Sequence, residues 1–176
     1  MVDVHQRAET QEIEMSLSQD PFADDPDRSA IWTMLVPRDI RAYVNADWSM
    51  VEDDFVADDF LGLHGNKTAN PDGWTISFPT LAHYREEWLR QAHEGRAVAY
   101  AEDVEAGIHR ATRLTEIEIS GDRAVAHKKF DGEIKLADGG VDRLNWQTLY
   151  FCRKVEGRWK LTGFVGYLPY PMGTPG

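Results

Sequence analysis

The sequence predicts an α+β fold, with helices in the first half of the chain and a strongly bent, mostly antiparallel sheet in the second. Two observations lead to this class. Hydrophobic residues recur at helical spacing in several segments between residues 29 and 94, whereas hydrophobic and polar residues alternate from about residue 106 onward. Elements of one kind followed by elements of the other are typical of α+β proteins, because α/β proteins alternate strand and helix.

The first helical segments follow Ser29, where the composition changes abruptly to hydrophobic residues. Asp27 or Ser29 is suited to cap the first of them. Pro37 predicts a break or kink, since proline cannot lie deep inside a helix. Two short amphipathic helices are then expected in sequence, and their hydrophobic residues are Ile40, Tyr43 and Val44, followed by Val51 and Phe55.

A pair of short strands and a longer helix come next. Residues 60–64 and 74–78 flank a loop that is rich in turn-forming residues, so they are expected to be strands. Pro79 and Thr80 then open a helix that runs to about Glu94. Gly95 is its predicted stop.

Four long strands complete the predicted sheet. Short turns rich in glycine and acidic residues separate alternating segments, which predicts an antiparallel meander. The expected strands are residues 111–119, 123–136, 143–155 and 158–168.

Charge is unevenly distributed along the 176-residue chain, whose net charge is −11. Residues 1–27 hold eight acidic residues against one arginine, and we expect them to form a flexible acidic arm. Residues 28–176 are enough for a single domain with a sizeable core.

Composition also excludes several classes of partner. The body has no basic stripe that could neutralise phosphates, so no nucleic-acid partner is expected, and anionic membranes are disfavoured. No hydrophobic run approaches the roughly 18 residues of a membrane span, and no secretory pattern is visible. Because Cys152 is the only cysteine, an internal disulfide is excluded and a reducing, cytoplasmic location is expected.

Three segments resemble a known family. They are YVNADWSMVEDDFVADD, LAHYREEWLRQA and EGRWKLTGFV. Over about residues 29–170 the chain resembles the cone-shaped α+β fold shared by nuclear transport factor 2, ketosteroid isomerase, scytalone dehydratase and the SnoaL-like polyketide cyclases. The resemblance implies a conical sheet with three helices from the N-terminal half packed on its concave face. It also implies a pocket inside the cone and a homodimer formed through the outer face of the sheet.

His64 is the position that this resemblance singles out. In ketosteroid isomerases the general-base aspartate lies five residues after the second Asp of a similar Ala-Asp-Asp turn, and counting from Asp59 reaches His64. Imidazole changes charge near neutral pH, so His64 could act as a catalytic base or acid; it could also be a loop-edge histidine bonded to backbone. Tyr43 lies about one helical turn after the family's tyrosine and is the expected hydrogen-bond donor to substrate.

Aromatic residues are numerous, and most are expected in the core. In a cone that encloses a cavity, a few would line the pocket and suit a ring-bearing ligand. Trp48 and Trp146 are the first candidates. The expected substrate-binding set also contains Tyr84, Trp88, Tyr150 and His127. The strand around His127 leaves the direction of its side chain open, so this residue could instead be structural or exposed.

No metal and no cofactor are expected. The acidic pairs Asp53-Asp54 and Asp58-Asp59 do not converge as a ligand set, because adjacent helical residues point about 100° apart. No phosphate-binding glycine loop and no nucleophile motif occurs.

The predicted function is the binding of a small hydrophobic molecule in a conical pocket, with cofactor-independent isomerase, dehydratase or cyclase chemistry as the associated activity. Two alternatives come from other classes of protein. One is a non-catalytic ligand-binding or protein-interaction module. The other is an assembly partner that resembles the β-subunits of ring-hydroxylating dioxygenases.

Overall fold

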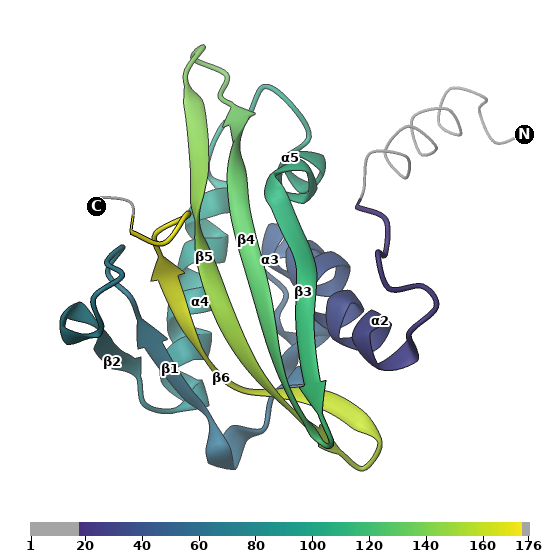
Figure 1. Cartoon of the computed structure of the whole chain (residues 1–176). Helices are drawn as coiled ribbons and strands as arrows, with labels where there is room; N and C mark the ends of the chain where they lie inside the picture. Colours follow the sequence, from purple (N-terminus) through teal and green to yellow (C-terminus); the bar gives the residue numbers. More distant parts are fainter. Residues whose placement is uncertain (1–17, 174–176) are drawn as a thin grey trace, which may run out of the picture.

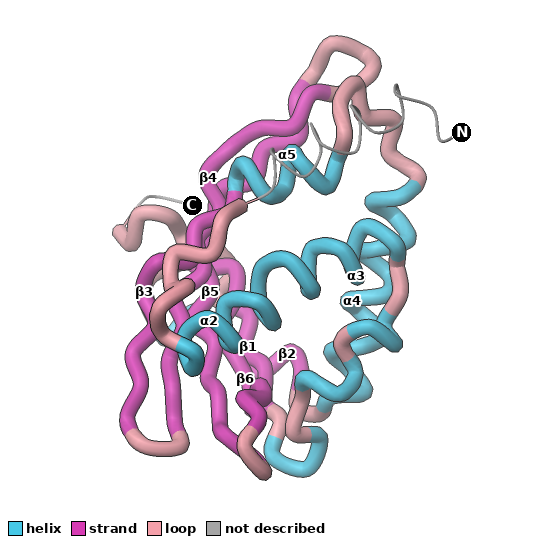
Figure 2. The backbone as a smooth tube through the Cα atoms, turned by 90° about the vertical axis from the view of Figure 1, so that its right-hand side faces the viewer, coloured by secondary structure: helices cyan, strands magenta, loops and turns pink. Residues whose placement is uncertain are grey.

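Six strands form one sheet in the order β2-β1-β6-β5-β4-β3, and the helices lie along one of its faces, around which the sheet bends (Figures 1 and 2). A computed structural model describes residues 18–173 of the chain. Neighbouring strands are antiparallel except β1 and β6, which are parallel. The strands are β1 (Leu61–His64), β2 (Thr75–Phe78), β3 (Thr112–Ser120), β4 (Arg123–Lys135), β5 (Val141–Val155) and β6 (Arg158–Leu168).

The helices of the described residues are α2 (Pro26–Thr33), α3 (Asp39–Asn45), α4 (Leu81–Arg96) and α5 (Val104–Ala111). The sequence predicted the first three regions but not α5, for which no helix was expected. Asp103 caps α5 by accepting a hydrogen bond from the backbone N–H of Ala106. The α+β class and the bent sheet are confirmed, with one helix more on the concave face than expected.

The break predicted at Pro37 is instead a π-helical turn, Met34–Arg38, that joins α2 directly to α3. Proline removes one backbone donor, and the wider turn accommodates that loss without ending the helix. Asp25 caps the start of α2 through the backbone N–H of Arg28.

The second amphipathic helix expected around Val51 and Phe55 does not form. Residues 48–59 make three 3₁₀ turns, Trp48–Met50, Glu52–Asp54 and Ala57–Asp59. Asp47 caps the first of these turns through the N–H of Ser49. The run of acidic residues favours such short capped turns over a continuous helix.

Helix α4 begins where expected, with Thr80 as its cap, but it continues through Gly95 to Arg96. Gly95 therefore does not stop the helix. A Cβ at this position would lie 3.8 Å from the ring and the hydroxyl of Tyr43, so glycine keeps the space beside that tyrosine open.

Part of the predicted acidic arm is packed on the domain. Asp27 accepts hydrogen bonds from Trp159 Nε1 at 2.8 Å and Lys154 Nζ at 2.7 Å, and Phe22 packs against the core. The predicted boundary at residue 28 lies inside α2. The rest of the arm, residues 1–17, lies outside the described residues.

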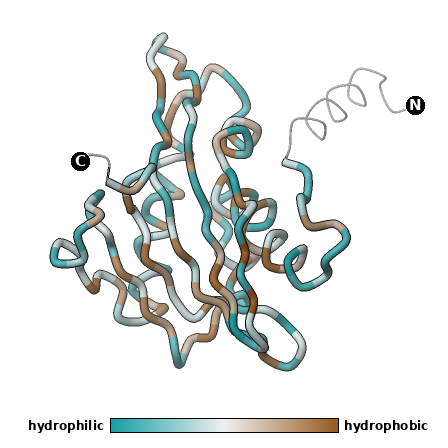
Figure 3. Tube along the Cα trace, viewed as in Figure 1, coloured by the Kyte–Doolittle hydropathy of each residue, from teal (hydrophilic) through white to brown (hydrophobic). Residues whose placement is uncertain are grey.

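The main core lies between α2, the π-helical turn and the concave face of the sheet. Hydrophobic and hydrophilic residues follow one another along the long strands (Figure 3), as expected for a sheet with one covered face. Ala126 of β4 and Cys152 of β5 are buried on that face, whereas Val125 and Phe151 are exposed on the other. Within residues 18–173, no helix is long and apolar enough to cross a membrane.

Candidate functional site

A cavity of about 530 Å³ lies between the helices and the concave face of the sheet. Its walls come from α3, α4, α5 and strands β4, β5 and β6, and most of its lining is aromatic or aliphatic. Five residues of the predicted site line it: Tyr43, Tyr84, Trp88, Trp146 and Tyr150. These residues are distant in sequence, and the sheet and the helices bring them together.

Two of the cavity tyrosines have hydroxyls without hydrogen-bond partners among the described residues. They are Tyr43 of α3 and Tyr84 of α4, and both residues line the cavity. Burial raises the pKa of Tyr43 to about 12 and holds the pKa values of Tyr84 and Tyr150 well above the ordinary range. All three side chains are therefore neutral phenols near pH 7, and each hydroxyl keeps its proton.

His64 does not line the cavity. Its ring stacks on that of Tyr167, with 4.3 Å between centroids, and it is Tyr167 that lines the cavity wall. The Nδ1 of His64 accepts a hydrogen bond from the backbone N–H of Asn66 at 3.0 Å, and burial lowers the pKa of the imidazole. The position of His64 matches a loop-edge histidine bonded to backbone and does not support a base acting on a bound molecule.

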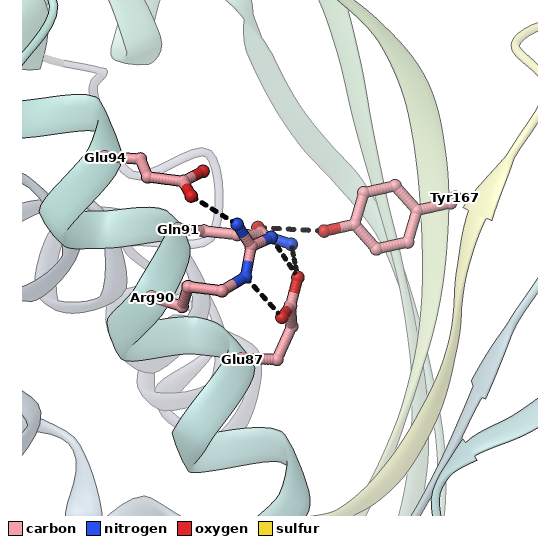
Figure 4. A network of polar contacts seen from close by, with 5 residues as sticks. All are labelled: Glu87, Arg90, Gln91, Glu94 and Tyr167. Carbon is pink, nitrogen blue, oxygen red and sulfur yellow. Dashed lines mark hydrogen bonds and ion pairs between the residues drawn. The ribbon is translucent and has the colours of Figure 1, made fainter.

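Tyr167 is held by a polar network on α4 (Figure 4). Its hydroxyl donates to Gln91 Oε1 at 3.0 Å, and Gln91 in turn donates to Glu87 at 2.7 Å. Arg90 bridges Glu87 and Glu94 on the same helix, and these bonds hold the pKa of Glu87 at about 2. The network joins β6 to α4 across one side of the cavity.

Trp48 and His127 also lie outside the cavity lining, contrary to prediction. Trp48 is the first residue of the first 3₁₀ turn and belongs to a hydrophobic cluster that includes residues of α4. Its ring centroid lies 5.1 Å from that of Phe55 and 5.3 Å from that of Trp88. His127 lies on the outer face of β4, because its neighbours Ala126 and Lys128 point inward. Its ring bonds to Glu116 and Gln147 of the adjacent strands.

The cavity also contains charged groups that were not predicted from the sequence. Lys128 of β4 and Asp39 of α3 both line it and form an ion pair at 2.9 Å. Near α5, the Tyr100 hydroxyl donates to Asp142 at 2.9 Å, and both residues also line the cavity. The alternation of residues along β4 is the one sequence signal for the position of Lys128, because it places this residue on the same face of the strand as Phe130.

No metal centre is visible in the described part of the chain, where no three His, Cys, Asp or Glu side chains converge. The cavity instead presents an apolar surface with a few polar groups at fixed points. Such a surface suits an organic ligand.

Comparison with solved structures identifies the fold. A nuclear transport factor 2 superfamily protein from Salmonella enterica serovar Typhimurium LT2 aligns over 86% of this chain and 97% of its own, with 14% identity and a TM-score of 0.54. A nuclear transport factor 2-like protein of unknown function from Pseudomonas putida KT2440 aligns over 83% and 89%, with 16% identity and a TM-score of 0.52. A protein from Novosphingobium aromaticivorans, described as nuclear transport factor 2-like with a cystatin-like fold, aligns over 99% and 94%, with 12% identity and a TM-score of 0.50.

The chain thus has the nuclear transport factor 2-like fold, as its sequence resemblance predicted. Neither family models nor curated proteins gave a match. At these identities the likeness extends to the fold alone, so the function is argued from the cavity.

Proposed function

We propose that this protein binds a small, largely apolar organic molecule in the cavity between the helices and the sheet. The observation that carries the proposal is the cavity itself, whose volume of about 530 Å³ is in the range of small-molecule sites. Trp88, Trp146 and Phe130 supply flat apolar walls, which favour a ring-bearing ligand. The unpartnered hydroxyls of Tyr43 and Tyr84 would orient its polar end.

Binding is favoured over proton transfer because the predicted catalytic pair is separated. Tyr43 lines the cavity, but His64 packs behind Tyr167. With a pKa raised to about 12, Tyr43 serves as a hydrogen-bond donor and not as a base near neutral pH. The proposal therefore assigns Tyr43 to ligand binding and assigns no catalytic role to His64.

A bulky substitution at the rim tests the cavity directly. Val98 lines the cavity and is 42% exposed, so Val98→Trp should narrow the entrance and weaken the binding of 2-ethylnaphthalene about tenfold in equilibrium dialysis. Val141→Trp is the matched control, because Val141 is 47% exposed and outside the lining. Equal affinities in both variants would contradict the proposed site, and no binding to the unmodified protein would contradict the function.

We also propose that two copies associate through the outer face of the sheet. Val125 and Phe151 face each other on β4 and β5 and are 40% and 37% exposed, which gives that face an apolar centre. Phe151→Glu should shift the protein from dimer to monomer in sedimentation, because it places a charge in the interface. Ile76→Glu, on edge strand β2, should leave the dimer intact.

A homodimer would also count against the role of an assembly partner for a separate catalytic subunit. A monomer at every concentration would contradict the proposed association. Equal dissociation of the dimer in the Phe151→Glu and Ile76→Glu variants would contradict the assignment of the interface to the outer face of the sheet.

A further inference from the structure

Lys128 is a buried cation in the wall of an otherwise apolar cavity. It projects from the centre of β4 toward the helices and is 1% exposed. Its Nζ donates to the backbone carbonyl of Leu35 at 2.5 Å and to Asp39 Oδ2 at 2.9 Å, and it lies 5.1 Å from the centre of the Phe130 ring. Burial of an ammonium group is costly, so this position in the cavity wall needs compensating partners.

The π-helical turn supplies one of these partners. In a regular α-helix the carbonyl of Leu35 would accept from the N–H of Asp39, but here that N–H donates to Val36. The Leu35 carbonyl thereby loses its α-helical donor and accepts from Lys128 instead. The turn thus holds the ammonium group at a fixed position in the cavity wall.

An ammonium group has three N–H donors, and partners among the described residues account for two of them. We propose that the third N–H of Lys128 binds an uncharged acceptor oxygen, such as a ketone or aldehyde carbonyl, at one end of the apolar ligand. This inference rests on the proposed function and names the ligand class. Lys128 is then the residue that selects oxygen-bearing ligands over hydrocarbons of the same shape.

The charges around the cavity favour a neutral oxygen over a carboxylate. Four charged residues line the cavity, two acidic and two basic: Asp39, Asp142, Arg96 and Lys128. Asp39 already neutralises Lys128 at 2.9 Å, so a ligand carboxylate would bring a second negative charge to one ammonium group. A carbonyl oxygen accepts the remaining N–H without that repulsion.

A matched pair of probes tests the inference on the unmodified protein. 2-Acetylnaphthalene and 2-ethylnaphthalene are of similar size, and the acetyl compound has a carbonyl oxygen where the ethyl compound has two hydrogens. We expect equilibrium dialysis to show about tenfold tighter binding of the acetyl compound, the size of effect that one charge-assisted hydrogen bond gives. Equal affinities for the two probes would overturn the inference while leaving the proposed function intact. Binding of neither probe would overturn the proposed function as well.

A double variant then assigns the preference to Lys128. Lys128→Met with Asp39→Asn removes both charges and keeps side chains of similar size, so no unpaired ion is left in the wall. The acetyl preference should disappear while the affinity for 2-ethylnaphthalene stays within about twofold. An unchanged preference, or an equal loss for both probes, would show that Lys128 is only structural. Naphthalene-2-carboxylate should bind the unmodified protein less tightly than 2-acetylnaphthalene. Tighter binding of the carboxylate would overturn the assignment to ligands with an uncharged oxygen.

Discussion

Asp39→Ala is expected to lower the free energy of unfolding by about 3–5 kcal/mol, the cost of leaving a buried charge without its partner. The Lys128 ammonium group is almost fully enclosed and would keep only the Leu35 carbonyl. Chemical denaturation followed by tryptophan fluorescence would measure the loss, because Trp88 and Trp159 are buried in the folded state.

The control for this prediction is the double variant that also carries Lys128→Met. Removing both charges should restore most of the lost stability, because a methionine side chain needs no counter-ion in the same space. A double variant as unstable as Asp39→Ala alone would show that Asp39 stabilises the helix by other means than its ion pair. An unaffected single variant would mean that the ammonium group finds a replacement partner.

Gly163→Ala is expected to cost about 3 kcal/mol or to prevent folding, because its added methyl group meets backbone that cannot move aside. A Cβ at Gly163 would lie 2.1 Å from the carbonyl oxygen of Leu61, its partner in the parallel pairing of β1 and β6. Relief of that clash would separate the two strands and detach β1 and β2 from the sheet. Urea unfolding of the Gly163→Ala variant and of the unmodified protein would measure the difference in the free energy of unfolding.

Gly140→Ala provides the matched control. Gly140 lies in the turn before β5, where the nearest atom to an added Cβ is the exposed side-chain oxygen of Asp138 at 3.1 Å. That oxygen accepts a hydrogen bond from the Gly140 N–H at 2.8 Å, and the exposed side chain can shift by a few tenths of an ångström without losing it, so the expected change is within about 0.5 kcal/mol. Similar losses in the two variants would contradict the assignment of the cost to the β1–β6 contact.

The long strands were predictable from sequence because their signals are local. Strand β6 begins and ends at the predicted residues, 158 and 168, since alternation and a tight Glu-Gly turn define it. Helix α5 was missed because it has only two turns and contains Gly107, which has a low helix propensity. Gly107 is tolerated there because its missing side chain makes room for Ile134, an effect of tertiary packing.

The site was harder to predict because it depends on the direction in which each side chain points as well as on the type of residue. The aromatic residues on α4 and β5 were identified from composition and spacing, and they line the cavity. His64 was placed by a count along the chain, which gave the right strand but not the intervening ring of Tyr167. Lys128 and Asp39 lie 89 positions apart and carry no motif, so only the folded chain shows their pairing.

The π-helical turn also sets the rotational phase of α3. Each residue of an α-helix advances about 100° around the axis, so a turn with one extra residue rotates everything after it by that amount. The side chains of Ile40 and Tyr43 reach the cavity in this rotated phase. A chain of the same fold without the turn would present a different set of side chains to the same space. Insertion or loss of a single residue between Met34 and Arg38 is thus a route by which the ligand preference of this fold can change while its sheet stays the same.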